Sequence, residues 1–132
     1  MDHRATGAQR VGFVLALIEA ILLGLMAAMH FGANVAGYTT PFLYPAGIVE
    51  GMLALGLVVA IAIPGDGGVR GGRVLAAQIL SVIGVFVIQV ALAQAPALSD
   101  LRSELWYGGI LTLSLASIAF VASPAFRRRV AS

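Results

Sequence analysis

Residues 29–56 of the chain read MHFGANVAGYTTPFLYPAGIVEGMLALG and connect two long apolar segments, at about 11–31 and 46–63. The connection contains prolines and glycines, which disfavour a continuous helix. Each flanking segment approaches the roughly 20 apolar residues that cross a bilayer as a helix. We therefore interpret this stretch as the turn between two transmembrane helices, with one ionisable residue on each side of it, His30 and Glu50.

The composition indicates that part of the chain lies in hydrocarbon. Of the 132 residues, 60% are hydrophobic and 11% are charged, and the mean hydropathy is +0.98. Soluble domains have about 45–50% apolar and about 25% charged residues. A soluble fold of this size could not bury so much apolar surface. We therefore expect residues 1–132 to form a single transmembrane domain, with the lipid bilayer as its surroundings.

Two further apolar segments, at about 74–95 and 106–123, complete the predicted fold. This is an all-α bundle of four transmembrane helices. The first segment is predicted to be a retained helix and not a signal peptide, because its apolar core exceeds 7–15 residues and contains Glu19. The Gly-rich segment 65–72, GDGGVRGG, lacks the GK[ST] ending of a phosphate loop, and we interpret it as a turn. The segment 97–105 is predicted to be a mixed-charge loop, and Pro124 to end the fourth span.

The distribution of arginine predicts the orientation in the membrane. Seven arginines lie in the N-terminus, the second connection and the C-terminus: Arg4, Arg10, Arg70, Arg73, Arg127, Arg128 and Arg129. Only Arg102 lies in the other two connections. By the positive-inside rule both termini are cytoplasmic. We expect the protein to lie in the bacterial inner (cytoplasmic) membrane. Because membrane topology accounts for the positions of the arginines, we expect no nucleic-acid partner.

Small residues at a spacing of four predict close helix packing. They are Ala16, Ala20, Gly24, Ala28 and Gly32 in the first segment, and Gly47 and Gly51 in the second. Such residues let helices approach closely in lipid, where van der Waals contact is the main attraction between them. The same pattern serves packing within one chain or between subunits, and the sequence does not separate the two. We expect a homo- or hetero-oligomer.

The candidate functional residues are the few polar side chains inside the spans. Glu19 lies near the middle of the first helix, where an ionised carboxylate is costly, and is expected to face the bundle interior. Glu50 lies about 6 Å below the outer boundary by helical rise, at nearly the depth of His30. An antiparallel pair of helices would bring these two side chains within reach. Gln89 and Thr112 fall at a similar depth, about 9 Å from the outer end.

Each candidate also has a structural interpretation. His30 would sit in the headgroup layer, Glu50 would cap the first turn of its helix, and glutamines would form interhelical hydrogen bonds. Trp106 and Tyr107 are interpreted as markers of the outer interface. Two potential ligands, His30 and Glu50, fall short of a typical metal site, so no metal is predicted, and the sequence leaves any cofactor unknown.

One family resemblance can be stated. The run PAGIVEGMLALGLVVAIAIPG from Pro45, followed by a short basic link and RVLAAQILSVIGV, resembles the second and third helices of DoxX-like four-helix membrane proteins. The matching positions are Glu50, Gly51, Leu55, Gly56 and Arg73. The likeness covers about half of the chain, and the first helix departs from the family pattern. The resemblance implies a four-helix membrane fold, in a group that includes subunits of quinone-linked oxidoreductases and many members with no assigned reaction.

Two functional hypotheses follow. In the first, the bundle binds a hydrophobic small molecule, quinone- or lipid-like, near the outer leaflet, with Glu19, His30, Glu50, Gln89 and Thr112 as polar contacts or proton groups. In the second, the protein is a non-catalytic accessory subunit of a larger membrane complex. The sequence leaves open whether any reaction is catalysed.

Overall fold

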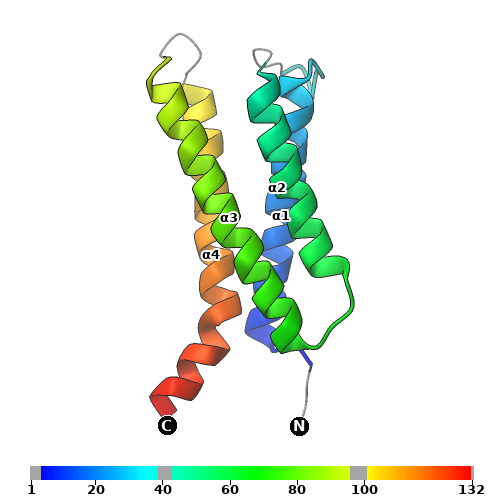
Figure 1. Cartoon of the computed structure of the whole chain (residues 1–132), viewed down its shortest axis with the longest axis vertical. Helices are drawn as coiled ribbons and strands as arrows, with labels where there is room; N and C mark the ends of the chain where they lie inside the picture. Colours follow the sequence, from blue (N-terminus) through cyan, green and yellow to red (C-terminus); the bar gives the residue numbers. More distant parts are fainter. Residues whose placement is uncertain (1–3, 39–42, 96–100, 132) are drawn as a thin grey trace.

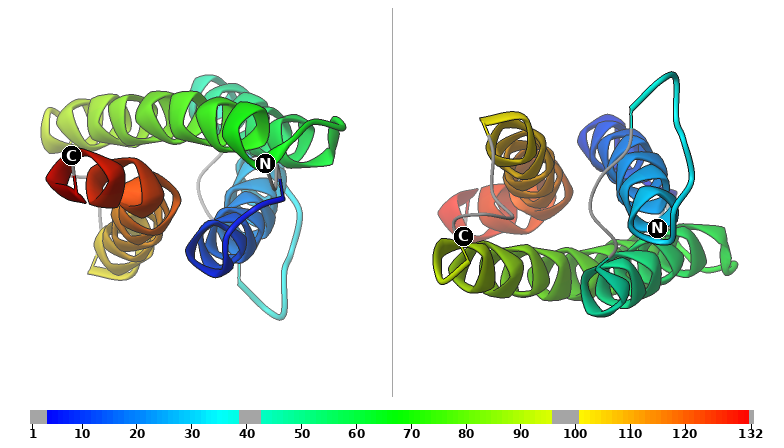
Figure 2. Two further views of the ribbon diagram at one scale, coloured as in Figure 1. Left: turned by 90° about the horizontal axis from the view of Figure 1, so that it is seen from below. Right: turned by 90° about the horizontal axis from the view of Figure 1, so that it is seen from above.

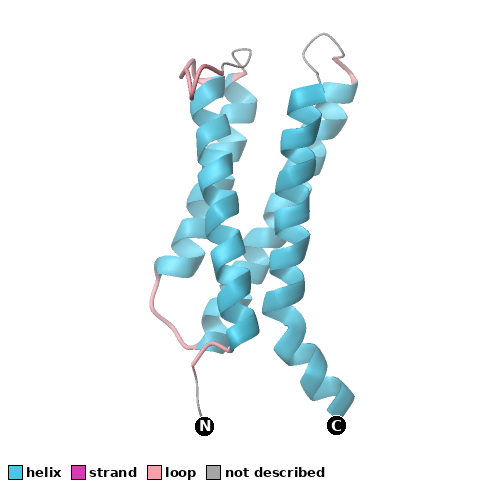
Figure 3. Ribbon diagram, turned by 180° about the vertical axis from the view of Figure 1, so that it is seen from behind, coloured by secondary structure: helices cyan, strands magenta, loops and turns pink. Residues whose placement is uncertain are grey.

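The computed structural model describes residues 4–38, 43–95 and 101–131, which contain four helices (Figures 1 and 3). The helices are α1 (Gly7–His30), α2 (Tyr44–Ala62), α3 (Gly67–Ala93) and α4 (Leu101–Ala131). Each contains a stretch long and apolar enough to cross a membrane. The predicted all-α architecture of an integral membrane protein is therefore confirmed.

The helices form a ring in which α1 packs against α2 and α4, and α3 packs against the same two helices. The first residues of α1, the last of α4 and the α2–α3 connection lie at one end of the bundle, at the bottom of Figure 1. We call this the terminus end. The other two connections lie at the opposite end, the loop end. Seen along the bundle, α3 is strongly inclined to its neighbours (Figure 2).

The first helix begins four residues before the predicted start, because a capping box precedes the apolar segment. The Thr6 hydroxyl accepts a hydrogen bond from the Gln9 backbone N–H at 3.1 Å, and the Gln9 side chain accepts one from the Thr6 N–H at 3.0 Å. These bonds satisfy donors that a helix start would otherwise leave without partners. Polar residues outside the hydrocarbon thus extend α1 beyond its apolar part.

The prediction that segment 65–72 is a turn is wrong from Gly67 onward, because α3 starts there. Asp66 caps this helix by accepting a hydrogen bond from the Val69 N–H at 2.8 Å. A Cβ on Gly67 would lie 2.8 Å from the Ala5 Cα, and one on Gly71 would lie 3.0 Å from the Gln9 Nε2. The glycines therefore permit close contact between α3 and the start of α1, and they do not mark a flexible link.

The fourth helix is also longer than predicted at both ends. Residues 97–100 of the predicted mixed-charge loop lie outside the described residues, and α4 begins at Leu101. It continues through Pro124 to Ala131, although a proline inside a helix removes one hydrogen bond and favours a kink. The C-terminal part of α4, red in Figure 1, bends away from the rest of the bundle.

Close packing at the predicted small residues is confirmed where α2 crosses the end of α1. A Cβ on Gly47 would lie 3.0 Å from the Phe31 ring, 3.1 Å from the His30 Cβ and 3.3 Å from the Ala27 carbonyl oxygen. Ala16 and Ala20 of α1 are also buried, as members of the hydrophobic core of the bundle. By contrast, a Cβ on Gly24 would contact nothing within 4 Å, so this position is not used for packing inside the chain.

We predict that Gly47→Leu destabilises the bundle by about 1–3 kcal/mol, the usual cost of forcing extra methylene groups into a packed site. Gly56→Leu, on the same helix, is the matched control because a Cβ there contacts nothing within 4 Å. Unfolding in mixed micelles, followed by circular dichroism, measures both. Equal stability of the two variants would contradict the close α1–α2 contact.

Candidate functional site

The interior of the bundle contains more polar side chains than an apolar membrane core requires. Those buried among the described residues are Glu19, His30, Glu50, Gln78, Ser81, Ser114 and Ser117. Because no water reaches the hydrocarbon to bond them, such groups are stable only where other helices supply partners. Most of them form two clusters at different levels of the bundle.

The first cluster lies toward the loop end and consists of His30, Glu50 and Tyr107. The Tyr107 hydroxyl donates a hydrogen bond to the Glu50 Oε1 at 2.5 Å. The His30 Nε2 lies 3.5 Å from the Glu50 Oε2 and 3.3 Å from the Tyr107 hydroxyl oxygen. All three side chains are buried, with Glu50 fully so. We call this group the loop-end cluster.

Three helices position the loop-end cluster. His30 is the last residue of α1, Glu50 lies in the second turn of α2, and Tyr107 lies in the second turn of α4. The close approach of Gly47 to the His30 Cβ brings the ends of α1 and α2 together. The prediction that His30 and Glu50 come within reach of each other is therefore confirmed.

The loop-end cluster combines a carboxyl, an imidazole and a phenol in contact, which are three groups that donate or accept protons. The Glu50 Oε2 makes no hydrogen bond within the described residues, and the His30 Nε2 lies within ion-pair distance of it at 3.5 Å. One carboxyl oxygen is thus fixed by Tyr107, while the other retains acceptor capacity. This arrangement can hold a polar group or relay a proton.

The second cluster lies halfway along the bundle around Glu19. Its Oε1 accepts hydrogen bonds from the Ser81 hydroxyl of α3 at 2.6 Å and from the Ser114 hydroxyl of α4 at 2.5 Å. Glu19 is fully buried, as the cost of a carboxyl in hydrocarbon predicts. We call these residues, together with Gln78, the central cluster.

Gln78 adds an unusual feature to the central cluster. It is fully buried one turn before Ser81 on α3, and its amide faces the Glu19 carboxyl. Neither its Nε2 nor its Oε1 makes a hydrogen bond of standard geometry within the described residues, nor does the Glu19 Oε2. Three buried polar atoms therefore retain bonding capacity at the middle of the bundle, where an unsatisfied group is costly.

The structure places the remaining predicted candidates outside these clusters. Thr112 is exposed on α4, and its hydroxyl donates to the Gly108 carbonyl of the same helix at 2.8 Å. Gln89 is partly buried on α3. Of the five candidates, the structure brings together His30 and Glu50, while Glu19 centres a separate cluster. Among the described residues, no group of three His, Cys, Asp or Glu side chains could hold a metal ion.

The sequence analysis missed the hydroxyl donors of both clusters. Tyr107 is 1% exposed, so its interpretation as an interface marker is wrong. The available signal was the buried face of α4, on which Tyr107, Ile110, Ser114, Ser117 and Val121 recur at spacings of three and four. Such a spacing places side chains on one face of a helix. A tyrosine and two serines on the interior face of a membrane helix indicate partners on other helices.

We predict that Ser114 and Glu19 are energetically coupled. Ser114→Ala leaves the carboxyl with one hydrogen bond fewer in the wild-type chain, but removes little in a Glu19→Leu background. A double-mutant cycle of unfolding free energies should give a coupling of about 0.6–2 kcal/mol, the range for hydrogen bonds between membrane helices. Ser123→Ala is the control, because that hydroxyl bonds within its own helix. Additive effects of Ser114→Ala and Glu19→Leu would contradict the observed contact.

Comparison of the chain with protein-family models, with curated proteins and with solved structures gave no significant match. The four long apolar helices indicate an integral membrane protein, and the two buried clusters are its candidate functional groups.

Proposed function

We propose that this protein binds a hydrophobic small molecule, quinone- or lipid-like, whose polar end contacts the loop-end cluster. The observation that carries the proposal is the fully buried Glu50 carboxyl, fixed by the Tyr107 hydroxyl on one oxygen and approached by His30 on the other. Buried acid–base groups surrounded by apolar side chains are typical of sites for small molecules with one polar end.

The chemistry of the three side chains suits a carbonyl or hydroxyl group. His30 can donate a hydrogen bond to a carbonyl oxygen, while the Glu50 Oε2 and the Tyr107 hydroxyl oxygen, whose proton is donated to Glu50, can accept one from a hydroxyl. The His30 Nε2 lies 3.5 Å from the Glu50 Oε2, within the distance of an ion pair, so a ligand that enters between them must replace this contact with its own polar atoms. Glu50, and Glu19 deeper in the bundle, would act as polar contacts or proton groups for the bound molecule.

Such a ligand would enter from the lipid. The outward faces of α1 and α2 carry large exposed apolar side chains near the cluster, among them Phe31, Ile48 and Met52. An apolar molecule that partitions into the bilayer reaches this end of the bundle sideways. The arginine distribution supports an orientation in which the terminus end is cytoplasmic, which would place the loop-end cluster in the outer leaflet.

The single tryptophan of the chain, Trp106, precedes Tyr107 and provides a probe of ligand binding. Protein in phosphatidylcholine nanodiscs is titrated with a short-chain ubiquinone, and quenching of the tryptophan fluorescence is recorded. We expect saturable quenching, with the affinity weakened about tenfold in Glu50→Gln and in Tyr107→Phe, the effect of losing one hydrogen bond to a buried group.

Tyr44→Phe is the matched control for Tyr107→Phe. Both tyrosines lie toward the loop end, but Tyr44 is exposed and packs its ring against Phe31 at 5.5 Å. The control should bind as the wild type does. Quenching that rises linearly with ubiquinone and is identical in all variants would overturn a quinone site at this cluster.

A second function, that of an accessory subunit, is favoured by a separate observation. Gly56 on α2 and Gly108 and Gly109 on α4 are exposed, and a Cβ on any of them would meet nothing within 4 Å. These glycines lower helix propensity without serving contacts inside the chain. Small residues on lipid-facing helices are typical of surfaces that pack against another helix.

Mass spectrometry after gentle extraction from the native membrane separates the two functions. A stoichiometric hydrophobic molecule that is lost in Glu50→Gln supports the binding function and identifies the ligand. A stoichiometric protein partner without a bound small molecule, retained in Glu50→Gln, supports the accessory function instead.

A further inference from the structure

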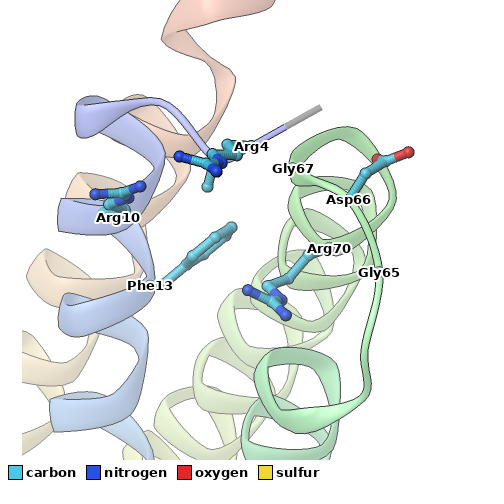
Figure 4. A pocket seen from close by; sticks show the side chains of 8 residues that line it. Arg4, Arg10, Phe13, Gly65, Asp66, Gly67 and Arg70 are labelled. Atoms are coloured by element: carbon cyan, nitrogen blue, oxygen red, sulfur yellow. The ribbon is translucent and has the colours of Figure 1, made fainter. Parts of the chain in front are cut away.

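A cavity of about 560 Å³ opens between the N-terminal ends of α1 and α3, at the terminus end of the bundle (Figure 4). Among the residues that the structure describes, three arginines line it, Arg4, Arg10 and Arg70, together with one carboxylate, that of Asp66. Figure 4 shows Arg4 and Arg10 on the α1 side and Arg70 on the α3 side, with the Phe13 ring between them. The lining therefore has an excess of positive charge and an apolar wall.

Arg70 provides the strongest indication of an anionic ligand. Its Nε is buried and makes no hydrogen bond to any residue that the structure describes. Arg73, one turn further along α3, instead donates to the backbone carbonyls of Ala60, Ile63 and Pro64 at the end of α2. A buried cationic donor without an acceptor is costly, and an anionic oxygen in the cavity would satisfy it.

The backbone adds to this positive potential. Both α1 and α3 begin beside the cavity, and Gly67, the first residue of α3, lines it. Helix N-termini carry partial positive charge and N–H groups that have no partner within the helix, which together favour anions. The Asp66 carboxylate is engaged with the Val69 N–H as the cap of α3.

The length of α3 places the cavity at the level of lipid headgroups. Its 27 residues extend about 40 Å at a rise of 1.5 Å per residue, whereas the hydrocarbon core of a bilayer is about 30 Å thick. The excess corresponds to the polar first two turns, which contain Arg70 and Arg73. These turns therefore lie where the phosphates of lipids lie.

We propose that this cavity binds a phosphate group, held by the guanidinium groups of Arg10 and Arg70, with Arg4 completing the charge. Arginine suits this role because its planar donors match phosphate oxygens in pairs. The phosphate belongs either to an anionic lipid headgroup or to a soluble phosphate compound, which share this chemistry. The site lies at the opposite end of the bundle from the loop-end cluster and does not depend on the function proposed there.

The test has two arms. In the first, purified protein is mixed with equal amounts of phosphatidylglycerol and phosphatidylcholine, and native mass spectrometry counts the lipids retained. In the second, inorganic phosphate is titrated into lipid-depleted protein in a calorimeter. Arg10→Gln and Arg70→Gln should weaken binding at least about tenfold in whichever arm detects it, the effect of losing a charge-assisted hydrogen bond. Arg10 is exposed, so its variant retains the fold.

Arg73→Gln is the charge-matched control, because it removes the same charge one turn away, outside the cavity. Circular dichroism verifies the fold of all three variants. Selective retention of phosphatidylglycerol that Arg10→Gln and Arg70→Gln abolish assigns the site to a lipid, and saturable heats with inorganic phosphate assign it to a soluble ligand. No binding in either arm, or equal effects of Arg70→Gln and Arg73→Gln, overturns the proposal.

Discussion

The hydrogen bonds that Ser81 and Ser114 donate to the Glu19 carboxyl join three helices at the middle of the bundle. In water, apolar helix faces are driven together by solvent, but in lipid the surrounding tails are as apolar as the helices themselves. Specific contacts must then select the arrangement. Glu19 and Ser81 belong to α1 and α3, which lie diagonally across the bundle from each other. Their hydrogen bond therefore links two helices that otherwise have few contacts. The loop-end cluster does the same for α2 and α4 through Glu50 and Tyr107.

The class of fold could be predicted from the sequence because an apolar segment of 18 or more residues can adopt few structures other than a membrane-spanning helix. In hydrocarbon every backbone group must be bonded within its own segment, and this leaves four apolar segments little choice except to form helices. The helix ends were less predictable. Capping by Thr6 and Asp66 and the polar turns of α3 lie outside the apolar segments, where hydropathy has no bearing on structure.

The candidate site could be predicted only in part, because the sequence indicates how deep a residue lies along its helix better than it indicates which way the side chain faces. The position of His30 opposite Glu50 follows from depth alone, because both flank the same connection. The partners of Glu19 depend on how α3 and α4 are rotated about their own axes, and a short serine gives little indication of that rotation. Tyr107 was misjudged because tyrosine is equally common at a membrane interface. Thr112 illustrates the converse, since a depth argument alone selected it, whereas its side chain is exposed on α4 and bonds within its own helix.

The unequal lengths of α2 and α3 affect how the protein sits in its membrane. The 19 residues of α2 extend about 28 Å, slightly less than a typical hydrocarbon core, whereas α3 exceeds it by about 10 Å. Arg73 donates hydrogen bonds to the carbonyls of Ala60 and Ile63, which supplies partners for two of the acceptors where α2 ends. Where both helices cross one bilayer, this difference in length would make the lipid beside α2 thinner than the lipid beside α3, and such an asymmetric deformation would favour thin membrane regions.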